Sequence, residues 1–87
     1  MKKIWHDDAW TDYLYWQTQD KRTLKKINNL IKNIDRNGYE CTGHPEPLTG
    51  DLSGYWSLHI DEKNRLVFRI ENGIIEIAQC KTHYEDK

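Results

Sequence analysis

The dipeptide Asn72-Gly73 constrains the fold of this chain more than any other feature. Asn-Gly is the preferred pair for a two-residue hairpin turn, and apolar and polar side chains alternate on both sides of it. The turn predicts a register in which Phe68 faces Ile77, so that the apolar sides of both strands coincide. The sequence therefore predicts an antiparallel hairpin with one buried face.

The same register predicts what lies on the other face of the hairpin. Its expected pairs are Arg69 with Glu76, Val67 with Ala78, and Arg65 with Cys80. The first is predicted to be an ordinary cross-strand ion pair without a functional role. Arg65 has no acidic partner in this ladder, and His83 and Tyr84 follow shortly after the residue opposite it.

The preceding strand, expected over residues 55–60, brings two more polar residues to this region. Trp56, Leu58 and Ile60 alternate on the core side, so His59 is expected on the polar face, next to Val67. Glu46 lies in the loop that leads into this strand. We therefore expect a carboxylate, a guanidinium, an imidazole and a phenol to converge at one end of the sheet.

The N-terminal half has helical periodicity after a possible short strand over residues 2–5. Asp7 or Asp8 is expected to cap a first helix that ends near Gln17, and Asp20 to cap a second that ends at Gly38. The second helix has an apolar stripe of Leu24, Ile27, Leu30, Ile31 and Ile34. Short-linked helices of this kind pack as a hairpin, and 87 residues bound the chain to one domain with one core.

Residues 38–54 are predicted to form one long ordered loop, because glycines and prolines recur through them. His6 and His44 have no identifiable partners and are expected at the surface. Two Cys-x-x-His pairs, Cys41 with His44 and Cys80 with His83, raise zinc as an alternative, but the spacing is not that of a standard finger and we predict no metal.

Charge leaves two readings open. The net charge of −1 argues against a dedicated nucleic-acid binder. Residues 21–36, however, carry six basic residues and one acid, a local net charge of +5 that fits either a solvated helix face or a phosphate-facing strip that includes Lys25 and Lys26. No apolar run approaches the length of a membrane span, and no export signal opens the chain, so we expect a cytoplasmic protein with reduced thiols.

The converging residues fit one reaction, cleavage of RNA by its own 2′-hydroxyl. Glu46 is an available base and His83 an available acid, since their side-chain types titrate near ~4.3 and ~6.5. Arg65 offers a permanent charge for the pentacoordinate phosphate, and Tyr84 a hydrogen bond or a stacking surface. The reaction needs no cofactor. Each residue also has a non-catalytic interpretation. Glu46 is then a solvated acid of the loop, Arg65 a cap of the turn before its strand, and the pair His83 and Tyr84 part of a frayed chain end.

The chain resembles the YoeB toxins of the RelE superfamily, which belong to bacterial type II toxin–antitoxin systems. The resemblance covers nearly its full length. It rests on six segments: 10–16, 20–32, 43–48, 52–57, 64–67 and the terminal pair His83-Tyr84.

The resemblance implies an α+β fold of two N-terminal helices packed on a twisted antiparallel sheet. It implies a ribosome-dependent mRNA interferase, an endoribonuclease acting in the ribosomal A site, with Glu46 as base, His83 as acid, Arg65 stabilising the phosphorane and Tyr84 positioning the phosphate. His59, Lys25 and Lys26 are expected to contact RNA. A YefM-like antitoxin, a homodimer, and operator DNA bound only together with the antitoxin are the implied partners.

The sequence also departs from the family pattern. Leu58 and His59 stand where the family commonly has two arginines, and Thr49 stands where a lysine is common. The lost positive charges keep one alternative open, an attenuated co-repressor that mainly binds the antitoxin. A second alternative, a gyrase-directed inhibitor of the ParE type, is disfavoured by the intact set of Glu46, Arg65, His83 and Tyr84. Three residues, 85–87, extend beyond the usual terminal tyrosine.

Overall fold

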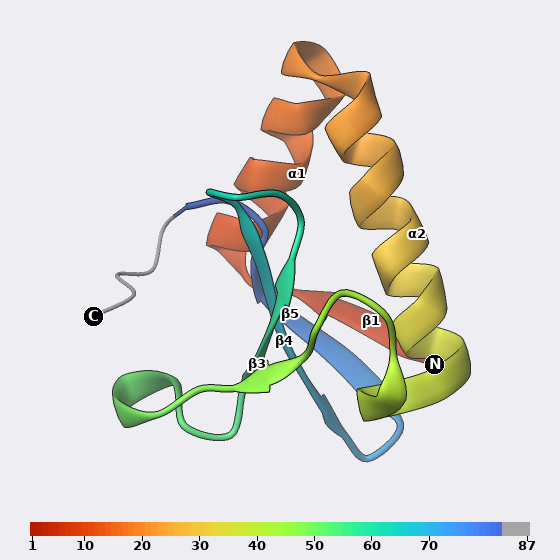
Figure 1. Cartoon of the computed structure of the whole chain (residues 1–87), viewed down its shortest axis with the longest axis vertical. Helices are drawn as coiled ribbons and strands as arrows, with labels where there is room; N and C mark the ends of the chain where they lie inside the picture. The colour runs from red at the N-terminus through yellow and green to blue at the C-terminus, as the bar shows by residue number, and fades with distance from the viewer. Residues whose placement is uncertain (83–87) are drawn as a thin grey trace.

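The structure is a computed structural model that describes residues 1–82 of the chain. Two helices and five strands make up its regular structure (Figure 1). In chain order they are β1 (Lys2–Trp5), α1 (Asp7–Gln19), α2 (Lys21–Asn37), β2 (Glu46–Pro47), β3 (Trp56–His59), β4 (Arg65–Glu71) and β5 (Ile74–Gln79), with short 3-10 turns at Gly38–Glu40 and Gly50–Leu52.

The five strands form one sheet in the order β1-β5-β4-β3-β2. Strands β3 to β5 are antiparallel neighbours, as expected. The short strand β2, within the segment predicted to be a loop, adds to β3 in antiparallel orientation, whereas β1 pairs in parallel with β5, so the sheet is mixed rather than wholly antiparallel. The helical hairpin separates β1 from the later strands in the chain, and β1 joins the sheet at the edge that β5 leaves free. The expected fold of two helices on a twisted sheet is confirmed.

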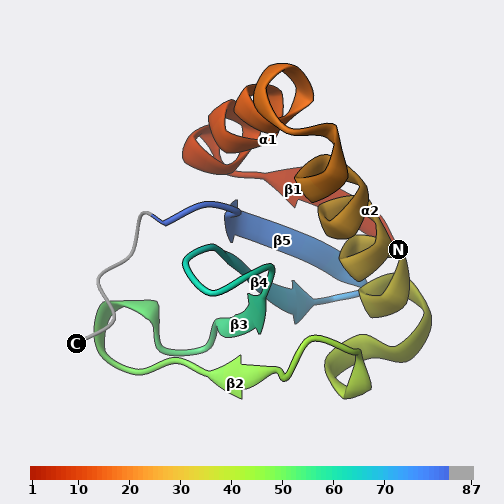
Figure 2. The same ribbon diagram turned by 45° about the horizontal axis from the view of Figure 1, so that its top comes forward.

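Both helices lie on one side of the sheet (Figure 2), and the hydrophobic core lies between the helices and the sheet. Ile27, Leu30 and Ile34 of α2 are buried against Phe68 and Ile77 of the hairpin. We call the side of the sheet that faces away from α1 and α2 the outer face. No helix among residues 1–82 is long and apolar enough to cross a membrane.

The helix ends agree with the sequence in part. Asp20 caps α2 as predicted: its carboxylate accepts hydrogen bonds from the backbone N–H groups of Arg22 and Thr23 at 3.1 and 3.2 Å. The cap of α1 was predicted wrongly, since His6 occupies that position and Asp7 and Asp8 lie in the first turn. Carboxylates there interact favourably with the helix dipole without acting as the cap.

The predicted register of the β4–β5 hairpin is correct near the turn and wrong farther from it. Arg69 faces Glu76 and Phe68 faces Ile77, as Asn72-Gly73 predicts. A β-bulge then shifts the ladder, so Val67 pairs with Gln79 instead of Ala78, and the predicted pairing of Arg65 with Cys80 does not form. One extra residue in one strand is enough to produce this shift.

Candidate active site

His59 and Arg65 are direct cross-strand partners at the end of the β3–β4 ladder. The sequence predicted His59 beside Val67, but that position is taken by Ser57. Because side chains alternate along a strand and Leu58 and Leu66 are in the core, His59 and Arg65 belong to the outer face. The correction brings the imidazole closer to the guanidinium than the sequence suggested.

Glu46 joins this pair from the neighbouring strand. Its position in β2 is opposite Ser57, and its Oε1 atom lies 3.3 Å from Nε2 of His59. Both side chains are accessible, with 67% of the Glu46 side chain and 41% of the His59 side chain exposed. The residues 38–54 are thus not wholly irregular, because the short strand β2 fixes Glu46 against β3.

His44 also reaches this group, contrary to the expectation that it has no partner. Its ring lies edge-on to that of His59, with 5.9 Å between ring centroids. The backbone carbonyl of Gly43 accepts a hydrogen bond from the N–H of His59 at 2.9 Å. The segment that carries Glu46 is therefore attached to β3 by backbone as well as by side chain.

Arg65 is held by the turn that joins β3 to β4. Its Nη1 atom donates to the carbonyl oxygens of Asp61 and Asn64, at 2.6 and 3.1 Å. Burial raises the pKa of Asp61, but hydrogen bonds from Asn64 and Lys63 outweigh that effect and lower it overall. Arg65 does cap this turn, as its non-catalytic interpretation predicted, but it does so through carbonyl groups. Within residues 1–82 its positive charge is therefore not neutralised by a direct ion pair.

The predicted residues His83 and Tyr84 lie outside the described residues. The strand that leads to them is described, and its last residue, Gln79, pairs with Val67, which places the end of β5 near the start of β4. Cys80 is anchored there from α1: its N–H donates to Asp12 at 3.0 Å and its carbonyl accepts from the Trp16 indole at 2.9 Å.

Lys25 and Lys26 are not part of this group. Both are exposed on α2, which covers the opposite side of the sheet. No contact among the described residues joins either lysine to Glu46, His59 or Arg65. If they contact RNA, they do so at a separate surface.

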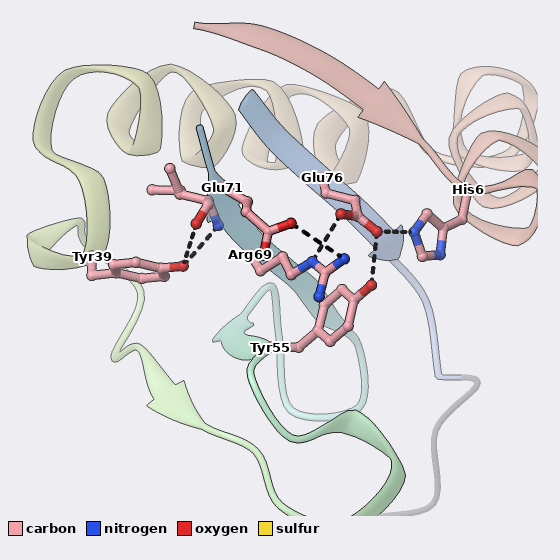
Figure 3. Close-up of polar contacts among 7 residues, drawn as sticks. His6, Tyr39, Tyr55, Arg69, Glu71 and Glu76 are labelled. Atoms are coloured by element: carbon pink, nitrogen blue, oxygen red, sulfur yellow. Dashed lines mark hydrogen bonds and ion pairs between the residues drawn. The ribbon is translucent and has the colours of Figure 1, made fainter. Parts of the chain in front are cut away.

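A second polar cluster lies on the outer face, and the sequence revealed only half of it (Figure 3). Glu76 accepts hydrogen bonds from Arg69 at 2.8 Å, as predicted, and also from His6 at 2.6 Å and Tyr55 at 2.8 Å. The bond from His6, followed by those from Arg69 and Tyr55, outweighs burial and lowers the pKa of Glu76 to about 2. His6 is 70 residues away in the chain, and no local pattern pointed to it.

The two thiols are buried, which does not favour the zinc alternative. Burial, with a smaller contribution from the charge of Asp12, raises the pKa of Cys80 to about 12, and burial also raises that of Cys41. Metal binding needs thiolates. Within residues 1–82, no three or more His, Cys, Asp or Glu side chains are grouped so that they could hold a metal ion.

Comparison with known proteins agrees with this fold. Residues 5–84 match the model of the YoeB-like toxin of bacterial type II toxin–antitoxin systems. Toxin YoeB of Escherichia coli K12 is 51% identical over 84 residues, which cover 97% of this chain and all of the relative.

Two solved structures from Staphylococcus aureus are also similar, each over 97% of this chain and 98% of the other. A YoeB-YefM complex has a TM-score of 0.90 at 44% identity, and a YoeB dimer has a TM-score of 0.88 at 45% identity. Family model, curated relative and fold all agree over nearly the whole length. The chain therefore belongs to the YoeB-like toxins of bacterial type II toxin–antitoxin systems.

Proposed function

We propose that this toxin is a ribosome-dependent endoribonuclease that cuts mRNA in the ribosomal A site. One observation carries the proposal: Glu46, His59 and Arg65 meet on the outer face, at the sheet end near which β5 also ends. A carboxylate, an imidazole and a guanidinium can supply the acid–base groups and the positive charge that metal-independent cleavage by the 2′-hydroxyl requires.

Each residue has a role in this proposal. Glu46 supplies the basic group that removes the 2′-hydroxyl proton, and Arg65 stabilises the charge on the phosphorane. His83 and Tyr84 follow β5 in the sequence; we assign His83 as the acid that protonates the 5′-oxygen and Tyr84 as the group that positions the phosphate. The products are a 2′,3′-cyclic phosphate and a 5′-hydroxyl. Lys25, Lys26 and His59 are proposed RNA contacts.

The proposed partners follow from the family. The complex and the dimer found for the Staphylococcus aureus relatives support a YefM-like antitoxin and a homodimer for this chain. We propose that residues 1–87 form one RelE-like domain that acts in the cytoplasm and binds operator DNA only together with the antitoxin.

The test is cleavage on a defined translation complex. Purified toxin is added to ribosomes that hold a message with a known A-site codon, and the cut is mapped by primer extension. Phosphorylation of the downstream fragment by a kinase, without prior phosphatase treatment, identifies its 5′-hydroxyl. Cutting that disappears in Glu46→Gln and His83→Ala supports the proposal. Intact message with wild-type toxin, together with normal antitoxin binding, would favour the attenuated co-repressor instead.

A further inference from the structure

His59 stands between the proposed base and the rest of the site. Its Nε2 atom is 3.3 Å from Oε1 of Glu46, its Cα is paired across the ladder with Arg65, and the ring of His44 touches it edge-on. These three residues come from β2, β4 and the segment before β2. Within residues 1–82, Glu46 and His44 contact the imidazole, and Arg65 is the charged residue paired with His59 across the ladder.

The contact with Glu46 favours one tautomer of His59. A carboxylate is an acceptor only, so Nε2 must carry a proton for a hydrogen bond to form, and in the neutral ring Nδ1 then bears the lone pair. Among the described residues, Nδ1 has no hydrogen-bond partner, and 41% of the side chain is exposed. A neutral imidazole held by a carboxylate, with its other nitrogen accessible, is the arrangement that makes histidine an effective general base.

We propose that His59 is a catalytic residue, whose Nδ1 atom accepts the 2′-hydroxyl proton while Glu46 holds Nε2–H. This inference rests on the proposed function but replaces Glu46 by His59 as the immediate proton acceptor, so that Glu46 becomes a positioning residue that acts through the imidazole. The 2′-O–H bond breaks as the 2′-oxygen attacks phosphorus, and the proton goes to Nδ1. The bond from phosphorus to the 5′-oxygen breaks, and that oxygen takes a proton from the acid.

The surrounding charges fit such a role. Protonation makes His59 positive beside the positive Arg65, which is unfavourable, and Glu46 compensates by facing the new charge directly. Arg65 is bound to the carbonyl groups of the turn rather than to Glu46, so the carboxylate remains available to the imidazole. His59 thereby differs from the arginine that is common at this position, because an arginine cannot accept a proton at neutral pH.

The experiment is single-turnover cleavage of saturated ribosome complexes as a function of pH. His59→Gln keeps an N–H donor for Glu46 but has no proton-accepting nitrogen, and His6→Gln, in the separate Glu76 cluster, is the matched control. We expect His59→Gln to cut at least ~100-fold more slowly at saturating toxin, and His6→Gln to stay within about threefold of wild type. The wild-type rate should fall at acidic pH, because a protonated imidazole cannot accept the 2′-hydroxyl proton, and the residual activity of His59→Gln should not fall in this way. Glu46→Gln combined with His59→Gln should be no slower than His59→Gln alone.

Two other results would overturn the inference. If His59→Gln cuts like wild type with the same pH profile while Glu46→Gln is inactive, Glu46 acts directly, and the proposed function stands without this role for His59. A wild-type toxin that leaves ribosome-bound message intact overturns both the proposed function and the role of His59. Nitrogen-15 chemical shifts of the free protein give a readout apart from activity: Nε2 should be protonated and Nδ1 not, and the opposite tautomer contradicts the proposal.

Discussion

The buried carboxylate of Asp12 on α1 accepts a hydrogen bond from the backbone N–H of Cys80, at 3.0 Å, just where β5 has ended. The indole of Trp16 donates to the carbonyl of the same residue at 2.9 Å. Helix α1 therefore holds both polar groups of one peptide segment. This segment directly precedes the C-terminal residues to which we assign the acid and the phosphate contact.

Replacing Asp12 should weaken both the fold and cleavage. Asp12→Ala leaves a buried N–H without its acceptor, which costs about 1–3 kcal/mol of unfolding free energy. Asp12→Asn keeps a carbonyl oxygen and should lose less. Urea denaturation measures the first effect and single-turnover cleavage the second. An Asp12→Ala protein that is as stable as wild type would show that the contact contributes nothing.

Removing the guanidinium of Arg65 should abolish most of the activity while the fold survives. We expect Arg65→Ala to cut at least ~100-fold more slowly, because the phosphorane loses one charged donor. Arg69→Ala is the matched control: this arginine lies in the same strand but is bound to Glu76, so its loss should reduce stability more than rate. Equal rates for Arg65→Ala and wild type would refute the assigned role.

Gly43 should tolerate no side chain, because it connects the Glu46 segment to the core. Its φ is +98°, and an added Cβ would lie 3.1 Å from Leu30 Cδ2 and 3.4 Å from Leu58 Cβ. Gly43→Ala should therefore cost about 1–3 kcal/mol and reduce cleavage by displacing Glu46 from His59. In Gly50→Ala the new Cβ meets nothing within 4 Å, so only backbone strain remains and the loss should be smaller. Thermal melting and cleavage assays compare the two.

Local patterns predicted the helices, the strands other than β2, and the inner part of the hairpin register, because periodicity and turn chemistry act over a few residues. They failed at the bulge between Phe68 and Val67, which no neighbouring residue announces. They also missed His6 as a partner of Glu76, since that contact depends on how the parallel edge strand β1 docks against β5. At the candidate site, the grouping of Glu46 with Arg65 was predicted, whereas the contact of Glu46 with His59 required the register of the folded sheet.

The thiols should be unreactive in the native protein. Cys80 is fully buried, with its pKa raised to about 12, and Cys41 is 6% exposed, with its pKa also raised. Since the thiolate is the reactive form, a disulfide reagent at about pH 8 should modify neither until the protein unfolds. Titration in denaturant, where both thiols react, is the control. Rapid modification of a native thiol would contradict the burial described for these residues.

Stability should depend on pH through Glu76. The pKa of Glu76 in the folded protein, about 2, lies below the ordinary value of 4.5. The ionised carboxylate therefore contributes fully to the unfolding free energy above about pH 4.5, and this contribution is lost as the pH falls toward about 2. The carboxylate is only 19% exposed, and the full effect is on the order of 2–3 kcal/mol. Other acids titrate in the same range, so the informative quantity is the difference in unfolding free energy between wild type and Glu76→Gln. We expect urea denaturation to give a large difference at about pH 7 that shrinks steadily below about pH 4.5. A difference that stays constant with pH would mean that the bonds from His6, Arg69 and Tyr55 do not depend on the charge of Glu76.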